Sequence, residues 1–183
     1  MIVLETDQLV LRHLAQNDAP FVVELLNDPD WLRFIGDRGV RTLEQAADYI
    51  EAGPVRMYAA YGFGLYLVER KADGAPTGLC GLVKRDFLDA VDLGFAFLPQ
   101  YRGAGYACEA ATGVLRYAAG PLGLTRVVAI TAHDNERSAR LLEKLGFRFE
   151  QTVPYPGEDE AVRLFAITLV GTSGGGVPPL TAR

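Results

Sequence analysis

The segment from Leu98 to Ala107, Leu-Pro-Gln-Tyr-Arg-Gly-Ala-Gly-Tyr-Ala, constrains the fold of this chain more than any other segment. In positions 90–97, just before it, large apolar side chains alternate with small or polar ones, which is the period of a half-buried strand. After it, apolar residues recur at helical spacing over 107–118. The glycines therefore stand where a helix begins, and the free N–H groups and the positive end of the helix dipole favour an anion there. The pattern predicts a phosphate-binding turn between a strand and a helix.

This turn is one of three motifs whose order in the chain is informative. Read as Gln100-x-x-Gly103-x-Gly105, it resembles an acyl-CoA pyrophosphate loop. The segment 135–147, which begins Asn-Glu-Arg-Ser, looks like a second cofactor-contacting helix, and the segment 4–19 contains the pattern of an opening strand and an Asp-Ala turn. Together the three motifs resemble the GNAT family of N-acetyltransferases, and the first segment is similar to its RimJ/RimL-type branch. Because they span most of residues 4–170 in the right order, they are far more specific jointly than singly.

The resemblance implies an α+β fold of mixed α/β order. It implies a mostly antiparallel central sheet, flanked by helices, that splays open between two central strands so that acyl-CoA can enter. The residue patterns agree with that order of elements. We expect strands near 9–14, 63–70, 77–85, 90–98, 125–132, 147–153 and 161–170, and helices near 18–28, 42–52, 104–119 and 135–145.

Bulk composition limits the classes of protein to which the chain can belong. With 183 residues, 49% of them hydrophobic, it fits one domain over residues 1–170. Residues 171–183 are rich in glycine and proline and predict a flexible C-terminal tail. No apolar run approaches the ~20 residues that cross a bilayer, so we expect a cytoplasmic protein without a membrane partner. The net charge of −5 argues against nucleic acid as a partner, and two cysteines and two histidines are too few for a metal site.

The resemblance also implies which residues hold acetyl-CoA, the expected cofactor. Backbone N–H groups from Arg102 to Ala107 are expected on the pyrophosphate, with Arg102 adding its side-chain charge, and Asn135 is expected on the pantetheine arm. A plain strand-to-helix turn, and a helix-capping role for Asn135, are the structural alternatives. A dinucleotide fold is disfavoured because the third glycine of G-x-G-x-x-G is missing. The full expected set is Phe97, Leu98, Arg102, Gly103, Ala104, Gly105, Tyr106, Ala107, Asn135 and Ser138.

For the chemistry, the resemblance implies direct attack of a primary amine on the thioester. Asp92 is the candidate to accept the amine proton or to hold the ammonium, with a solvated strand carboxylate as the alternative. Ser138 is the candidate proton donor or hydrogen-bond donor to the leaving sulfur, because the position where many relatives carry a tyrosine is Leu142 here. A serine that only belongs to the first turn of a helix is the structural alternative. Cys108 has no adjacent histidine to activate it and is expected to pack, and His133 is a weaker candidate base. A main-chain N–H near Phe97 is expected to polarise the thioester carbonyl.

The sequence indicates the acceptor site less clearly than the cofactor site. Trp31, Phe34 and the arginines at 33, 38 and 41 fall in a region that shapes the acceptor pocket in relatives, and the acidic loop 155–160 offers carboxylates to a cationic substrate. The expected partner is an amine acceptor, either a protein N-terminus or a small molecule, and a homodimer is compatible with the sequence. The alternative function is a non-catalytic acyl-CoA-binding or sensing domain, because the cofactor motifs are clearer than any acid or base.

Overall fold

The computed structural model describes residues 1–170, and the predicted tail 171–183 lies outside the described residues. Eight strands form one sheet in the order β1-β2-β3-β4-β5-β6-β8-β7. The strands are β1 (Ile2–Glu5), β2 (Leu9–Arg12), β3 (Leu65–Arg70), β4 (Pro76–Val83), β5 (Val91–Phe97), β6 (Arg126–Thr131), β7 (Arg148–Val153) and β8 (Val162–Thr168). The α-helices are α1 (Ala19–Leu26), α2 (Pro29–Phe34), α3 (Leu43–Ile50), α4 (Arg56–Tyr61), α5 (Tyr106–Ala119) and α6 (Glu136–Lys144).

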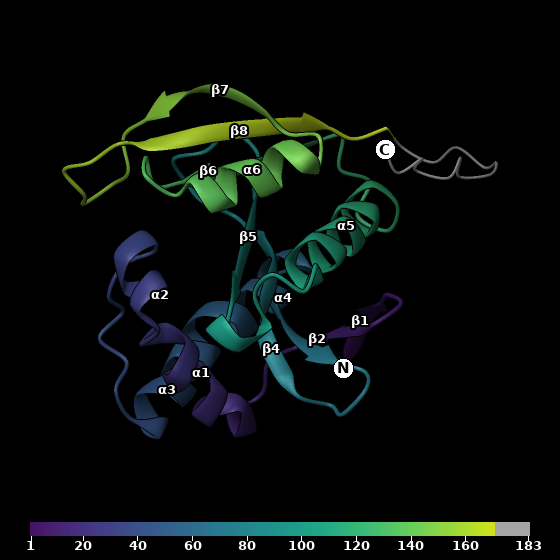
Figure 1. The fold of residues 1–183 in the computed structure, drawn as a ribbon, viewed down its shortest axis with the longest axis vertical. Helices are drawn as coiled ribbons and strands as arrows, with labels where there is room; N and C mark the ends of the chain where they lie inside the picture. Colours follow the sequence, from purple (N-terminus) through teal and green to yellow (C-terminus); the bar gives the residue numbers. More distant parts are fainter. Residues whose placement is uncertain (171–183) are drawn as a thin grey trace.

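The sheet opens between β5 and β6. Every other neighbouring pair in the sheet is antiparallel, whereas β5 and β6 are parallel and pair only through residues 91 and 92 with 127 and 128. Beyond that point the two strands diverge. In Figure 1, β8 runs horizontally whereas β5 runs vertically. The expected antiparallel sheet that splays between two central strands is confirmed.

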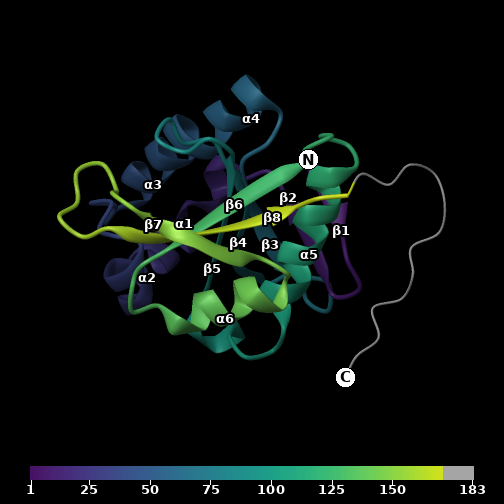
Figure 2. The same ribbon diagram turned by 90° about the horizontal axis from the view of Figure 1, so that it is seen from above.

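Helices cover the first half of the sheet on both faces. The buried alanines and Val114 of α5 pack on one face, in a core that includes Leu82 and Phe97. On the other face α1 and α3 enclose a second core around Leu25, Ile50 and Leu79. Figure 1 shows α1 and α3 on the opposite side of β4 and β5 from α5. In Figure 2, which is seen from above, β6, β7 and β8 lie in front of α1 and α3. The open end of the sheet is therefore bordered by three separate segments, which are α2, the start of α5 and the start of α6.

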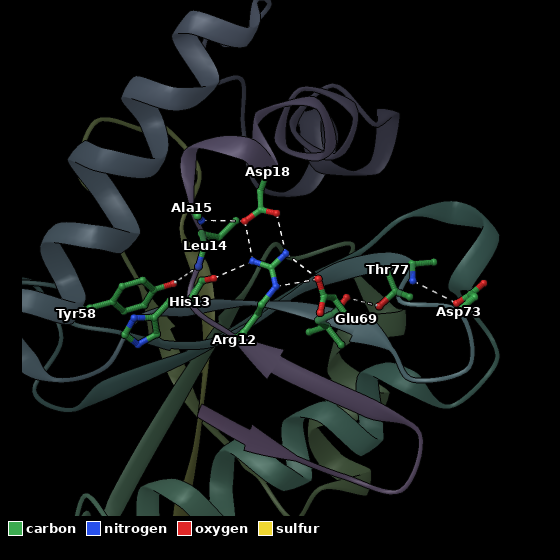
Figure 3. A network of polar contacts seen from close by, with 11 residues as sticks. Arg12, His13, Leu14, Ala15, Asp18, Tyr58, Glu69, Asp73 and Thr77 are labelled. Carbon is green, nitrogen blue, oxygen red and sulfur yellow. Dashed lines mark hydrogen bonds and ion pairs between the residues drawn. The ribbon is translucent and has the colours of Figure 1, made fainter. Parts of the chain in front are cut away.

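The opening motif of the chain has a structural explanation in an ion-pair network at the end of β2 (Figure 3). The guanidinium of Arg12 donates to both oxygens of Asp18 at 2.8 Å and, through Nε, to Glu69 at 2.8 Å. Asp18 is 8% exposed and also accepts the N–H of Ala15 at 2.8 Å. Because a buried carboxylate is stable only when paired and hydrogen-bonded, Arg12 and Asp18 require one another. The Asp-Ala turn thus anchors the first helical segment to β2 and β3.

Two elements were absent from the sequence-based expectation, and one is longer than expected. β1 is a four-residue edge strand, too short to show a period, and α2 follows α1 after two residues. The signals for α2 are present, since Asp28 caps it and Pro29 occupies its first position. The helix expected at 42–52 continues through a π-helical segment (Glu51–Val55) into α4. Pro54 lies inside that segment, and its missing N–H accounts for the irregular turn.

Candidate functional site

Two adjoining cavities lie where the sheet opens. The first, of about 300 Å³, is lined by the glycine loop and is called the glycine-loop cavity: its lining includes Arg102, Gly103, Gly105, Tyr106, Ala107 and Arg137. The second, of about 310 Å³, is called the Arg85 cavity: its lining includes Arg38, Leu65, Arg85, Asp92, Thr131 and Tyr155. The two cavities share the lining residues Trp31, Phe34, Ile35, Phe95, Ala96, Asn135 and Ser138. They therefore form one groove that runs from the start of α5 past the start of α6 toward the β7–β8 loop.

The glycine loop presents a run of backbone donors. Gly103 and Gly105 have φ of 79° and 86°, and a Cβ added at either position would meet nothing within 4 Å. The left-handed backbone, rather than lack of space, is what requires glycine there. The first helical hydrogen bond of α5 runs from Glu109 N–H to Gly105 O (3.0 Å), so the N–H groups of residues 106–108 have no helical acceptor. This geometry suits an anionic ligand.

Arg102 is placed differently from the sequence-based expectation. Its N–H donates to Pro99 O (3.2 Å), and its Nε donates to Phe97 O (2.7 Å). The remaining guanidinium nitrogens contact the carboxylates of Asp28 and, at 2.8 Å, Asp30. The predicted run of donors therefore begins at Gly103, because the donors of Arg102 are already used to fix the loop to β5 and α2.

Acidic residues of α2 thus lie beside the glycine loop. Asp30 also accepts from Arg137 of α6 at 2.7 Å, and Arg33 pairs with Asp134 at 2.7 Å. The hydrogen bond from Arg137 is the main reason that the pKa of Asp30 lies below its usual value. These pairs connect α2 to both sides of the groove. Sequence reasoning missed Asp28 and Asp30, because nothing local links them to a loop seventy residues away.

The start of α6 brings two expected residues to the junction of the cavities. Asn135 accepts the N–H of Ser138 at 3.1 Å, so its role as a helix cap is confirmed. Ser138 is half-buried, and both residues line both cavities. The helix ends at Lys144, and Gly146 just after it has a φ of 96°, which agrees with the expectation that this glycine ends the helix. Leu142 is fully buried and lines the Arg85 cavity, so the position that holds a tyrosine in many relatives is apolar here.

The free edge of β5 faces the groove. Leu98 N–H donates to Thr77 O of β4 (2.9 Å), and the β4–β5 register has no shift along β5. Because N–H groups alternate between the two sides of a strand, those of Phe95 and Phe97 face the opening rather than β4. The bond from Arg102 to Phe97 O on that same side agrees with this direction. Leu98 itself is 3% exposed in the core, and exposed Ala104 is not among the lining residues of the glycine-loop cavity.

Asp92 lies at the point where β5 and β6 separate. It is 1% exposed, so the alternative of a solvated strand carboxylate is wrong. Oδ2 pairs with Arg85 Nε at 2.6 Å, and Oδ1 accepts the N–H of Ile130 at 3.3 Å. Burial raises the pKa of Asp92 above its usual value, and the charge of Arg85 opposes that rise. Both oxygens are therefore already engaged, and Asp92 joins the two halves of the sheet.

The remaining expected residues differ in which cavity they line. Trp31 and Phe34 line both cavities, and Arg33, Arg38 and His133 line the Arg85 cavity. Cys108 lines the glycine-loop cavity from the first turns of α5, while Arg41 is exposed and pairs with Asp37 instead (2.6 Å). No local pattern indicates Arg85 or its hydrogen bond to the Tyr155 hydroxyl (3.2 Å), since these residues come from different loops.

Comparison with known proteins agrees with this geometry. The profile of the family described as "Acetyltransferase (GNAT) domain" matches residues 8–148, which is more than half of the chain. The chain belongs to the GNAT acetyltransferase family.

Relatives within the GNAT family cover nearly the whole chain. The uncharacterized N-acetyltransferase YoaA of Bacillus subtilis (strain 168) is 29% identical over 150 residues, which cover 81% of this chain and 84% of that protein. A GNAT-family acetyltransferase from Bacillus anthracis superposes with a TM-score of 0.75 at 25% identity, covering 92% of this chain and 98% of that one. RimL, an α-N-acetyltransferase of the ribosomal protein L7/L12 solved with coenzyme A, superposes with a TM-score of 0.78 at 17% identity. The superposition covers 92% of this chain and 98% of the RimL chain. At that identity the likeness to RimL shows the GNAT fold alone.

Within residues 1–170 of this GNAT protein, no helix has the length and apolar character needed to cross a membrane.

Proposed function

We propose that this GNAT protein transfers an acetyl group from acetyl-CoA to a primary amine by direct attack. The observation that carries the proposal is the junction of the two cavities, where one groove passes from free backbone donors at a helix start to a chamber lined by side chains. When bound, acetyl-CoA supplies a thioester carbon to which the neutral amine adds, forming the C–N bond and releasing the CoA thiol. The residues of this chain bind and orient both molecules and move the protons.

On the cofactor side, the N–H groups of Gly103 to Ala107 are proposed to bind the pyrophosphate. The positive helix terminus favours the negative charge, and the exposed glycines allow close approach of the phosphates. Arg102 contributes by holding the loop in place through Phe97 O rather than by its own charge. Asn135 lies further along the groove and is proposed to contact the pantetheine arm with its amide N–H₂, because its oxygen already caps α6.

At the junction, two kinds of group are proposed to act on the reacting atoms. The β5 N–H groups of Phe95 and Phe97 face the opening and supply donors for the oxygen that becomes negative during attack. A donor preset for such an oxygen contributes about 2.7–4 kcal/mol. Ser138 is proposed to hydrogen-bond the leaving sulfur through its hydroxyl and to pass a proton to it while a water molecule returns a proton to the serine oxygen. Ser138 lines both cavities, and its N–H, not its hydroxyl, serves the helix cap.

The amine proton is proposed to leave through water toward the open acceptor end. His133 is exposed there and lines the Arg85 cavity. Asp92 is proposed to support this end by orienting Arg85 and by holding β5 to β6, rather than by taking the proton directly. Its two occupied oxygens are the reason for this revision.

The RimJ/RimL-type branch is proposed as the place of this protein within the family. The opening segment of the chain, with its Arg12–Asp18 pair, supports that placement. The acceptor is then a protein N-terminus or a small-molecule amine.

The test is an acetyl-transfer assay with isotopically labelled acetyl-CoA, followed by mass spectrometry of the amines. The panel contains N-terminal peptides, amino acids, amino acid amides and polyamines, and a sample without protein corrects for spontaneous acetylation. We expect labelled product from at least one class of amine and stoichiometric release of CoA thiol. Saturable acetyl-CoA binding with no product from any class would overturn the transferase proposal and support a cofactor-binding module.

A further inference from the structure

The end of the Arg85 cavity that lies away from the glycine loop contains two arginines with donors to spare. Arg85 uses Nε for Asp92 (2.6 Å) and Nη1 for the Tyr155 hydroxyl (3.2 Å). Among the contacts of residues 1–170, its Nη2 has no acceptor, and Arg38 has neither a hydrogen bond nor an ion pair. Both residues line the same cavity. A guanidinium fork that is fixed on two sides and open on the third is well arranged to bind a planar anion.

The charged residues that line this cavity differ in how strongly water screens them. Asp92 offsets Arg85, and Arg33 is paired with Asp134. Arg38, Glu158 and Glu160 also line the cavity, and all three residues are exposed. Exposed charges are screened by water and salt far more than half-buried ones such as Arg85. Arg85 therefore provides the least screened free donor, and Arg38 adds a guanidinium that no described carboxylate pairs.

We propose that the acceptor of this enzyme is a small amine that carries its own anionic group, a carboxylate or a phosphate, bound by Arg38 and Arg85. The inference rests on the proposed acetyl transfer and specifies its substrate class. Held there, the anion directs the amine toward the shared section of the groove, where Phe95 and Ser138 lie. The cavity volume of about 310 Å³ is at the small end of ligand pockets, which fits a molecule of amino-acid size.

The experiment compares matched acceptors that differ only in the anion. One pair is L-leucine and L-leucinamide, and a second pair is O-phosphoethanolamine and ethanolamine. The ratio of kcat/KM within each pair is measured for the native protein and for Arg38→Gln. Taking the change in that ratio removes the intrinsic difference in reactivity between the two amines. Arg56→Gln is the matched control, because Arg56 is an exposed arginine on α4 outside the lining of both cavities.

We expect the native protein to prefer at least one anionic acceptor over its neutral partner, and Arg38→Gln to reduce that preference by about 10-fold or more, since hydrogen bonds to charged groups contribute ~1.5–3 kcal/mol. Arg56→Gln is expected to leave the preference unchanged. A preference for the carboxylate or for the phosphate identifies which anion the site takes. The inference would be overturned if the neutral partners, a peptide or spermidine reacted faster than both anionic acceptors. It would also be overturned if the ratio in Arg38→Gln equalled that of the native protein.

Acetyl-CoA binding, measured by calorimetry on the same samples, separates this failure from a failure of the proposed function. If acetyl-CoA binds and neutral amines react faster, only the anion site is wrong. If acetyl-CoA does not bind, the acetyl-transfer proposal is wrong and the anion site loses its basis as well.

Discussion

The two cavities of the groove differ in what they are made of. The glycine-loop cavity takes its donors from consecutive backbone N–H groups of one turn, and the side chains there mainly fix the turn, as Arg102 does. The Arg85 cavity takes its polar groups from side chains on β5 and on the loops after α2, β4 and β7. A ligand held by backbone is insensitive to most side-chain changes, whereas a ligand held by side chains depends on each of them. We therefore expect cofactor binding to be robust and acceptor choice to be easily altered.

Gly105→Glu is the change that most directly challenges the backbone half of this comparison. It places a carboxylate beside the expected pyrophosphate and forces a side chain onto a φ of 86°. We expect the Kd for CoA, measured by calorimetry, to rise at least ~100-fold, equivalent to about 2.7 kcal/mol.

Gly123→Glu is the matched control for that variant. Gly123 also has a positive φ, of 62°, and open space around its Cβ position, but it lies in the turn before β6. It imposes similar backbone strain without touching the groove. Unchanged CoA affinity in folded Gly105→Glu, or an equal loss in Gly123→Glu, would refute the assignment of the pyrophosphate to this loop.

Ser138→Ala tests the junction between the two cavities. If the hydroxyl delivers the proton to the leaving sulfur, kcat should fall by about 100-fold while the Kd for acetyl-CoA changes little. The helix cap should survive, because Asn135 bonds the N–H of Ser138 and not its hydroxyl. The measurement is steady-state kinetics beside calorimetry, and equal kcat for the two proteins would remove Ser138 from the chemistry.

Asp92→Asn sharpens the comparison on the acceptor side. Asparagine keeps an oxygen for either Arg85 or Ile130 but loses the charge. We therefore expect kcat to fall by less than ~10-fold and the free energy of unfolding to fall by about 1.5–3 kcal/mol. The two quantities are read from initial rates and from denaturant unfolding. A loss of kcat beyond ~100-fold with little change in stability would instead identify Asp92 as the general base.

Asp30→Asn carries the smallest expected effect and tests whether α2 competes with the cofactor. Asp30 holds Arg102 and Arg137 through partly exposed ion pairs, which contribute at most ~1 kcal/mol each. Removing its charge should free those arginines for phosphate and lower the Kd for CoA by a few-fold. Asp37→Asn removes an equal charge from the exposed pair with Arg41 and should leave the Kd unchanged. Weaker CoA binding in Asp30→Asn would show that α2 supports the cofactor rather than opposing it.

The same difference between local and distant groups decides what the sequence allowed one to predict. The strand-turn-helix around Gly103 and Gly105, the cap at Asn135 and the end of α6 at Gly146 follow from residues within a few positions of each other. The opening between β5 and β6 came from family resemblance, because no local pattern encodes it. The contacts of Asp92 with Arg85, and of Arg102 with Asp28 and Asp30, join segments brought together only by the fold. Local patterns therefore left Asp92 either as a proton acceptor or as a solvated carboxylate, whereas the fold makes it buried and paired.

The most direct test of the account is a calorimetric titration of the purified protein with acetyl-CoA, with NADH titrated in parallel. The account predicts saturable binding of acetyl-CoA at one site per chain, no binding of NADH, and loss of acetyl-CoA binding in Gly105→Glu but not in Gly123→Glu. Absence of acetyl-CoA binding to the native protein, or equal binding of both nucleotides, would contradict the assignment of the glycine loop to the acyl-CoA pyrophosphate.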